Sequence, residues 1–155
     1  IWLINFALME KKEEKKVLQD LGEFGLIERI TKSIKLNNKS SEQGVGDDAA
    51  ILDYSKSKVV VSTDMLIEGI HFDMTFTPLK HLGYKAVTAN ISDIYAMNAY
   101  PKQITVSLGL SSKYTLEAID EIYEGIYLAC KKYGVDVVGG DTTSSINGLV
   151  ISITA

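Results

Sequence analysis

The 155 residues predict a single α/β domain of a globular protein. Three observations carry this prediction. Short apolar runs typical of strands alternate along the chain with longer segments whose apolar residues recur every three or four positions, as in helices. Hydrophobic residues make up 46% and charged residues 23% of the chain, which are ordinary values for a soluble globular protein. The length suits one compact domain with its own core.

The first predicted helix covers residues 23–35. One face of this segment is apolar, with a hydrophobic side chain at every third or fourth position: Phe24, Ile27, Ile30 and Ile34. Residues 37–43 are polar and loop-like, and they lead into Gly44-Val45-Gly46-Asp47-Asp48. The short apolar run Ala49 to Leu52 then indicates a strand.

The middle of the chain predicts a strand, a helix and a second strand. Residues 58–66 contain three consecutive valines, typical of a strand covered on both faces, and include the polar run Ser62-Thr63-Asp64. Pro78 suits the first turn of a helix that extends to Met97. Ile104 to Leu110 indicates the next strand. The predicted inner face of the helix comprises Leu79, Leu82, Ala86, Ala89 and Ile94.

The last third predicts a capped helix and two strands. Thr115 is a suitable N-cap, and Gly134 ends the helix. The strand at Val135 to Val138 runs into a loop-like Gly139-Gly140-Asp141-Thr142-Thr143, and a final strand covers Leu149 to Thr154. The apolar helix face comprises Leu116, Ile119, Ile122, Ile126, Ala129 and Tyr133.

We assign residues 1–21 to a flexible N-terminal extension and residues 22–155 to the domain. Met9 is the expected natural start. Because the chain stops inside an apolar strand, we expect it to continue into a second domain.

Charge and composition exclude several classes of protein. The net charge of −4, with no stripe of Lys or Arg after residue 16, argues against nucleic-acid binding. Residues 1–9 are apolar but too short to span a bilayer, and the positive charges follow them, unlike in a secretory signal. The lone Cys130 excludes a disulfide framework and fits a reducing, cytoplasmic location. With only His71 and His81, a metal site would have to use oxygen ligands.

Four clusters place an aspartate beside small or hydroxyl residues where a loop meets a regular element. Taken singly, each cluster is explained by ordinary turn or cap chemistry. Taken together, they favour Mg²⁺, which prefers hard oxygen ligands and combines one or two carboxylates with substrate phosphates. The clusters are Gly46-Asp47-Asp48, Ser62-Thr63-Asp64, Asn90-Ile91-Ser92-Asp93 and Gly139-Gly140-Asp141-Thr142.

No Walker-type, Gly-x-Gly-x-x-Gly or protein-kinase signature is present in the sequence. A nucleotide would therefore be recruited through metal bridges to carboxylates. Glycines beside those carboxylates would let a polyphosphate approach the backbone closely.

These motifs resemble the N-terminal domain of the thiamine-monophosphate kinase family. The resemblance covers roughly residues 22–155, and the His71 segment favours this family over its relatives, aminoimidazole ribonucleotide synthetase and selenophosphate synthetase. The matching strings are Gly44-Val-Gly-Asp-Asp-Ala-Ala50, Ser62-Thr-Asp-Met-Leu-Ile-Glu-Gly-Ile-His-Phe72, Tyr84-Lys-Ala with Asn90-Ile-Ser-Asp93 and Met97, and Gly139-Gly-Asp-Thr-Thr143. One departure is Tyr95-Ala-Met-Asn98, where relatives usually have Gly last; Asn tolerates a left-handed backbone, so the helix end can survive.

The resemblance implies a mixed β-sheet with helices packed on one face, and pairing of this sheet across a homodimer. It also implies roles for individual residues. Several Mg²⁺ ions would be bound by Asp47, Asp48, Ser62, Thr63, Asp64, Asp93 and Asp141. His71 would contact the phosphate of thiamine monophosphate, and Tyr123, Gly140 and Asp141 would lie along ATP. Without the family context, His71 would be a structural histidine and Tyr123 a packed aromatic residue.

The implied reaction is in-line transfer of the ATP γ-phosphoryl group to thiamine monophosphate, giving thiamine diphosphate. It needs no protein nucleophile and no general base, because the acceptor is already a phosphate oxygen. Two alternatives stay open: another ATP-dependent synthetase of the same superfamily, and a non-catalytic domain that binds Mg²⁺ and nucleotide. We expect this part of the chain to be inactive by itself.

Overall fold

The computed structural model describes residues 25, 28, 31–33, 36–37, 39–44, 46–47 and 49–155. The chain divides into two units, Ile1–Lys35 and Leu36–Ala155. In the first unit the described residues Gly25, Glu28 and Thr31 have helical backbone. The predicted extension at 1–21, the expected start at Met9 and most of the predicted helix at 23–35 lie outside the described residues.

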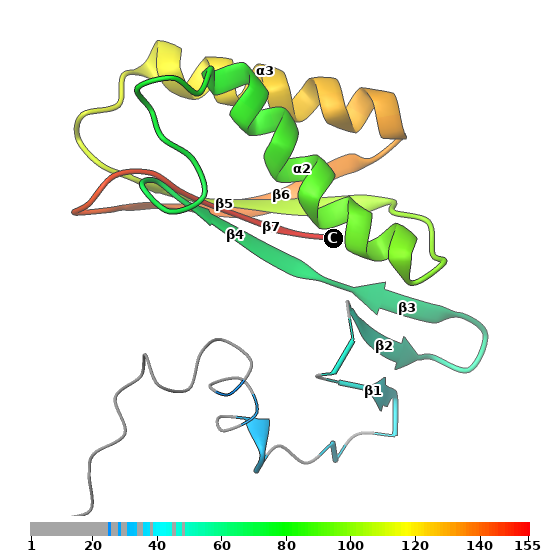
Figure 1. Cartoon of the computed structure of the whole chain (residues 1–155). Coiled ribbons are helices and arrows are strands. Elements are labelled where there is room, and N and C mark those ends of the chain that lie inside the picture. Colours follow the sequence, from blue (N-terminus) through cyan, green and yellow to red (C-terminus); the bar gives the residue numbers. More distant parts are fainter. Residues whose placement is uncertain are drawn as a thin grey trace, which may run out of the picture. The chain divides into compact units, whose positions relative to one another are not determined.

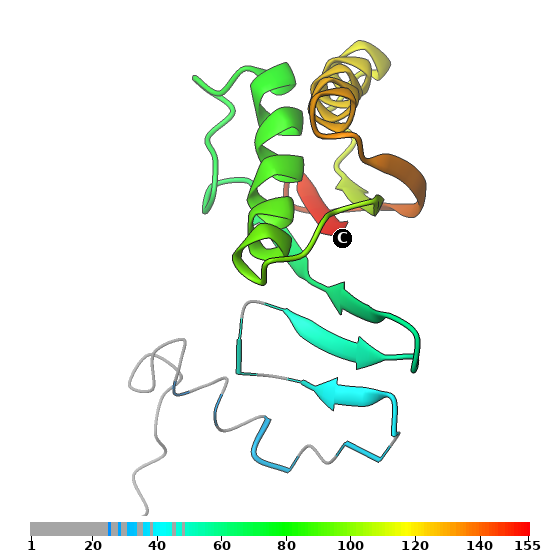
Figure 2. The same ribbon diagram turned by 90° about the vertical axis from the view of Figure 1, so that its right-hand side faces the viewer.

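The second unit is built around a four-stranded mixed sheet with strand order β4-β7-β5-β6. Its strands are β4 (Thr63–Ile67), β5 (Gln103–Leu110), β6 (Asp136–Ser144) and β7 (Val150–Thr154). β7 pairs antiparallel with both β4 and β5, whereas β5 and β6 are parallel. Both long helices lie on one face of this sheet, and no other described element covers the opposite face (Figures 1 and 2). The predicted fold class is confirmed.

The two helices begin and end where their caps predict. α2 (Leu79–Ala96) starts after Pro78, which precedes the first turn instead of lying within it. At its end Asn98 is left-handed with φ 55°, as expected of an Asn in place of Gly. α3 (Leu116–Tyr133) is capped by the Thr115 side chain and stopped by a left-handed Gly134. No helix within the described ranges is long and apolar enough to cross a membrane.

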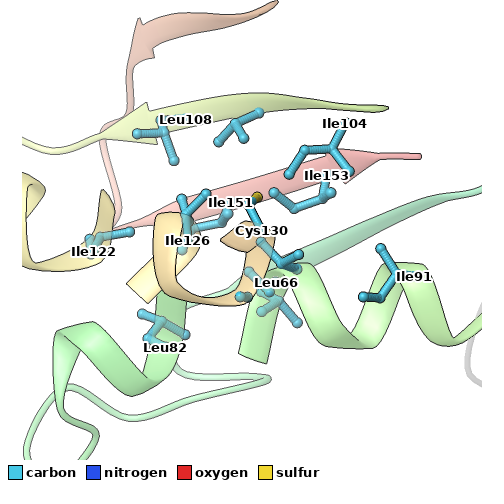
Figure 3. Close-up of a cluster of buried hydrophobic side chains, with 14 of the residues drawn as sticks. Leu66, Leu82, Ile91, Ile104, Leu108, Ile122, Ile126, Cys130, Ile151 and Ile153 are labelled. Carbon is cyan, nitrogen blue, oxygen red and sulfur yellow. The ribbon is translucent and has the colours of Figure 1, made fainter. Parts of the chain in front are cut away.

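α2 and α3 cross at two glycines. A Cβ on Gly83 would lie 2.0 Å from the Ile122 carbonyl oxygen, so only glycine permits this close approach. Below the helices, β-branched and leucine side chains from the sheet complete one core (Figure 3). Leu116, predicted to be on the inner face of α3, is instead 80% exposed. The largest fully buried side chains are those of Leu82, Ile91, Ile104, Ile122, Ile126, Leu149, Ile151 and Ile153.

A second, three-stranded antiparallel sheet has the order β1-β2-β3. It comprises β1 (Ser41–Gln43), β2 (Ala50–Asp53) and β3 (Lys58–Val61). The single strand predicted over residues 58–66 is therefore wrong: it divides at Ser62 into β3 and β4, which belong to different sheets. β3 is not covered on both faces either, since Val59 is 42% exposed. The valines reflect β-propensity on a half-open surface.

The predicted loop at residues 139–143 is also wrong, because these residues continue strand β6. The register pairs Gly140 with Val106 of β5. A Cβ on Gly140 would lie 1.9 Å from the Val106 carbonyl oxygen. The glycine is thus required by the close approach of two strands, a reason that a one-dimensional pattern does not reveal.

Candidate active site

Ser62, Asp64 and Asp93 meet where β4 passes under the end of α2. Asp64 is level in the sheet with the buried Ile153 and Val106, so it lies on the face that the helices cover. Asp93 is in the last turn of α2. The Ser62 hydroxyl, from a residue that is 7% exposed, donates a 2.9 Å hydrogen bond to Asp93 Oδ2. Two of the four predicted clusters are therefore brought together.

The electrostatics of this group favour a cation. Partial burial raises the pKa of Asp64, and the negative charge of Asp93 raises it further, while His71 acts in the opposite direction. Asp93 also lies at the negative end of the α2 dipole, and the last turn of α2 has no basic residue. Both carboxylates are thus held in a negative environment that a metal ion would relieve.

Asn90 supports the same interpretation. It lies one helical turn before Asp93 and is fully buried, yet its amide oxygen and nitrogen have no hydrogen-bond partner in the described part of the chain. Buried amides are normally hydrogen-bonded. A hydrated cation beside Asp93 would bring water within reach of such a group, since Mg²⁺ keeps several waters. The two carboxylates and the Ser62 hydroxyl are oxygen donors of the kind that Mg²⁺ prefers.

The loop that carries Asp47 adjoins this group through the small sheet. Ala50, the first residue of β2, pairs with Val61, the last residue of β3. The loop that ends at Ala50 and the segment that begins at Ser62 therefore lie at the same end of the β2–β3 pair. Asp47 is exposed and accepts a 3.2 Å hydrogen bond from the Gln43 side-chain amide. Asp48, predicted as a metal ligand, lies outside the described residues.

Asp141 is not brought to Asp64 within one chain. It is level with Ser107 of β5, on the open face of the sheet, and β6 is three strands from β4. At the usual strand spacing this separates their backbones by about 14 Å. The Thr63 and Thr154 hydroxyls form a 3.0 Å hydrogen bond, so the Thr63 side chain also lies on the open face. The convergence of all four clusters, expected from the sequence, is not seen in the single chain.

Accordingly, no three His, Cys, Asp or Glu side chains of the described residues are grouped as a metal centre. Mg²⁺ commonly takes only one or two carboxylates and fills its remaining positions with water and phosphate oxygens. The pair formed by Asp64 and Asp93 meets that requirement. The metal-binding roles of the individual residues stay predictions.

His71 lies on a turn that follows β4. The Ile67 backbone N–H donates a 3.0 Å hydrogen bond to His71 Nδ1, so Nδ1 carries no proton and the neutral ring has its N–H at Nε2. The Lys85 ammonium donates to the His71 carbonyl oxygen at 3.0 Å. His71, Lys85 and Phe76 line a hollow of about 360 Å³. The Asp73 carboxylate also lines the hollow, and one of its oxygens accepts hydrogen bonds from the Thr75 N–H and hydroxyl. The imidazole donor and the Lys85 cation are groups that suit an anion.

The sequence patterns alone do not distinguish Lys85 or Glu68 as functional residues. Lys85 is the middle residue of the matching string Tyr84-Lys-Ala. Only its contact with the His71 turn, 14 residues away, gives it significance. In the sequence, the string that contains Glu68 and the string that contains Lys85 are informative only when they occur together, and neither residue is informative by itself.

Tyr123 is on α3 and is half-buried against the core. Its ring lies 5.6 Å from that of Tyr127, and the two line a shallow hollow with Asp120 and Glu124. Two carboxylates make this hollow unsuited to a polyphosphate, although an aromatic base could stack there. The predicted contact with ATP stays a prediction for Tyr123, as it does for Gly140 and Asp141.

The sequence and the fold both have counterparts among known proteins. Residues 46–155 match the model of the family described as "AIR synthase related protein, N-terminal domain". The thiamine-monophosphate kinase of Bacillus subtilis strain 168 is 38% identical over 135 residues, covering 86% of this chain. That of Aquifex aeolicus is 36% identical over 128 residues, covering 83% of the chain. The resemblance predicted from the motifs is confirmed.

A solved structure described as "AaThiL complexed with AMPPCP and TMP" superposes with a TM-score of 0.79. It is 35% identical to this chain and covers 90% of it. The chain spans only about two fifths of these relatives, 41% of the Bacillus protein and 42% of the solved chain.

Proposed function

This chain belongs to the family of AIR synthase related proteins, whose N-terminal domain residues 46–155 match, and we propose that it is the nucleotide-binding part of a thiamine-monophosphate kinase. The reaction would transfer the γ-phosphoryl group of ATP to thiamine monophosphate, giving thiamine diphosphate and ADP. Support comes from relatives with that name and from the neighbour bound to TMP and to AMPPCP, an ATP analogue. The observation that carries the proposal is the paired carboxylates of Asp64 and Asp93 near the His71 turn.

Asp64 and Asp93 would hold Mg²⁺ together with Asp48, Asp141 and the Ser62 and Thr63 oxygens. Asp47, the neighbour of Asp48 in the sequence, would be a further ligand. Bound Mg²⁺ would neutralise the triphosphate and the phosphate acceptor, which otherwise repel each other. Ser62 keeps Asp93 oriented through their 2.9 Å hydrogen bond. The carboxylates of this chain thus position the nucleotide and need not react.

His71 would bind the phosphate of thiamine monophosphate. Because Nδ1 is occupied by the Ile67 N–H, the Nε2–H is the donor that a phosphate oxygen can accept. Lys85 adds a positive charge beside the same hollow. No side chain acts as a nucleophile or general base, since the attacking atom is a phosphate oxygen of the acceptor.

The open face of the main sheet supports a homodimer. Met65 on this face is 52% exposed, although it belongs to a strand of the main sheet. Asp141 and the Thr63 side chain are on the same face, so a second copy packed there would bring these groups of both copies to one interface. The measurement is the mass of the complete protein in solution by light scattering, and a monomer would contradict the dimer. We place the enzyme in the cytoplasm, where both substrates would be available.

The test of the function is an assay of the complete protein with thiamine monophosphate and Mg-ATP, with thiamine diphosphate quantified directly. Formation of thiamine diphosphate is expected. ATP hydrolysis that depends on a different acceptor would instead favour a synthetase of the same superfamily. Nucleotide binding without turnover would favour a non-catalytic Mg-nucleotide-binding domain, which is also the expected state of residues 22–155 alone.

A further inference from the structure

Glu68, directly after β4, has one of the most fully satisfied carboxylates among the described residues. Its Oε2 accepts hydrogen bonds from the Tyr114 hydroxyl at 2.7 Å and from the Leu149 backbone N–H at 2.8 Å. Its Oε1 accepts from the Lys113 ammonium. The side chain is only 16% exposed. It therefore ties the end of β4 to the loop before α3 and to the start of β7.

Glu68 is also the first residue of the turn that carries His71. The turn is closed by backbone hydrogen bonds, from Gly69 N–H to the Phe72 carbonyl at 2.8 Å and from His71 N–H to the Ile67 carbonyl at 2.9 Å. Phe72 buries its ring in the core. The turn is thus anchored at one end by Phe72 and at the other by the Glu68 carboxylate, and the exposed His71 ring projects between these anchors.

The position opposite Glu68 is shaped for its carboxylate. Gly148 has φ +88°, which disfavours other residues. A Cβ at this position would in addition lie 2.5 Å from Glu68 Oε2. The loop before β7 therefore leaves room for the carboxylate and offers it the neighbouring Leu149 N–H.

We propose that Glu68 is a positioning residue for the thiamine-phosphate site, holding the His71 turn in the orientation that presents His71 Nε2–H to the substrate phosphate. The inference rests on the proposed function, because His71 is its reporter. All the hydrogen bonds that the Glu68 carboxylate accepts, as described above, come from the protein. Its removal should loosen the turn and weaken binding of thiamine monophosphate, while leaving the nucleotide side of the site intact.

The experiment uses steady-state kinetics of the complete protein, with the substrates varied separately. Glu68→Ala should raise KM for thiamine monophosphate by about tenfold or more and change KM for ATP by less than about threefold. Glu68→Gln retains an acceptor oxygen for Tyr114 and Leu149, so a smaller rise of about two- to threefold is expected. Glu42→Ala is the matched control: it removes a carboxylate that pairs with Lys58 on the small sheet, and both KM values should stay unchanged.

A second arm tests whether Glu68 acts through His71. In a His71→Ala background, adding Glu68→Ala should change KM for thiamine monophosphate by less than about twofold, because the ring that Glu68 positions is gone. An unchanged KM in folded Glu68→Ala would overturn the proposal, as would equal rises in both KM values. If Glu68→Ala does not fold, the Glu68→Gln variant is the test. A wild-type KM for thiamine monophosphate in Glu68→Gln would then also overturn the proposal. A wild-type enzyme that forms no thiamine diphosphate would instead refute the proposed function.

Discussion

Asp64, near the start of β4, and Glu68, directly after its end, lie four residues apart, yet their carboxylates are in opposite situations. Glu68 accepts hydrogen bonds from Lys113, Tyr114 and the Leu149 N–H. The Ser152 hydroxyl donates to the backbone carbonyl of Asp64, but no hydrogen bond reaches the Asp64 carboxylate from the described residues, and this carboxylate faces the like charge of Asp93. One carboxylate is used by the fold, and the other is left available.

Their pKa values express this difference. Burial by itself would raise the pKa of Glu68, but the hydrogen bonds from Lys113, Tyr114 and Leu149 outweigh it and hold the pKa below the ordinary value. For Asp64, burial raises the pKa and Asp93 adds to the effect. A carboxylate whose acceptor sites are filled by the protein stabilises the structure, whereas one that meets another anion is suited to binding a cation.

The largest expected effect concerns the available carboxylate. Asp64→Asn should lower Mg-ATP affinity or turnover by at least about tenfold, on the order of 1.4 kcal/mol, because a metal ligand is lost. Asp141→Asn should do the same if a second copy brings that residue to the site. Thermal unfolding without metal should change little in either variant. The control is Asp136→Asn, an exposed aspartate at the start of β6. A sharp fall in the thermal midpoint of both variants would assign these residues to the fold.

The next effect concerns the carboxylate that the fold uses. Because the folded pKa of Glu68 lies below its ordinary 4.5, ionised Glu68 stabilises the folded protein above pH 4.5. That contribution is lost as the pH falls through the folded pKa. Glu68→Gln should therefore lower the free energy of unfolding most above pH 4.5, and its curve should approach that of the wild type at lower pH. Chemical denaturation from pH 3 to 7 measures this, and a pH-independent difference would contradict the assignment.

The smallest effect has the opposite sign. The folded pKa of Asp64 lies above its ordinary 3.8, so ionised Asp64 opposes folding at neutral pH in the absence of metal. This cost is relieved as the pH falls through the folded pKa and is absent below 3.8. Metal-free Asp64→Asn should accordingly be as stable as the wild type or slightly more stable at pH 7, with no advantage at pH 3. Marked destabilisation at pH 7 would remove the contrast with Glu68.

The sequence could predict those features whose causes lie within a few residues. Thr115 and Gly134 cap α3 by local chemistry, so its bounds were predicted correctly. The mixed sheet with helices on one face followed from the family resemblance and is confirmed. The break at Ser62 was missed, because β3 and β4 differ only in their distant pairing partners.

The candidate site was predictable to the same extent. The aspartates were recognised by residue type, but whether they meet depends on sheet order, which places Asp141 on the open face and away from Asp64. The partners of Glu68 are more distant still in sequence, with Tyr114 46 residues and Leu149 81 residues away. No local pattern reveals which of two nearby carboxylates is already engaged.

The most direct test of the central claim is titration of the complete protein with ATP by calorimetry, with Mg²⁺ present and with Mg²⁺ removed by chelation. If the paired carboxylates of Asp64 and Asp93 bind the nucleotide through metal, ATP affinity should fall by about tenfold or more without Mg²⁺. ATP that binds equally well in both conditions would contradict the account, since two anions do not attract a third without a cation between them.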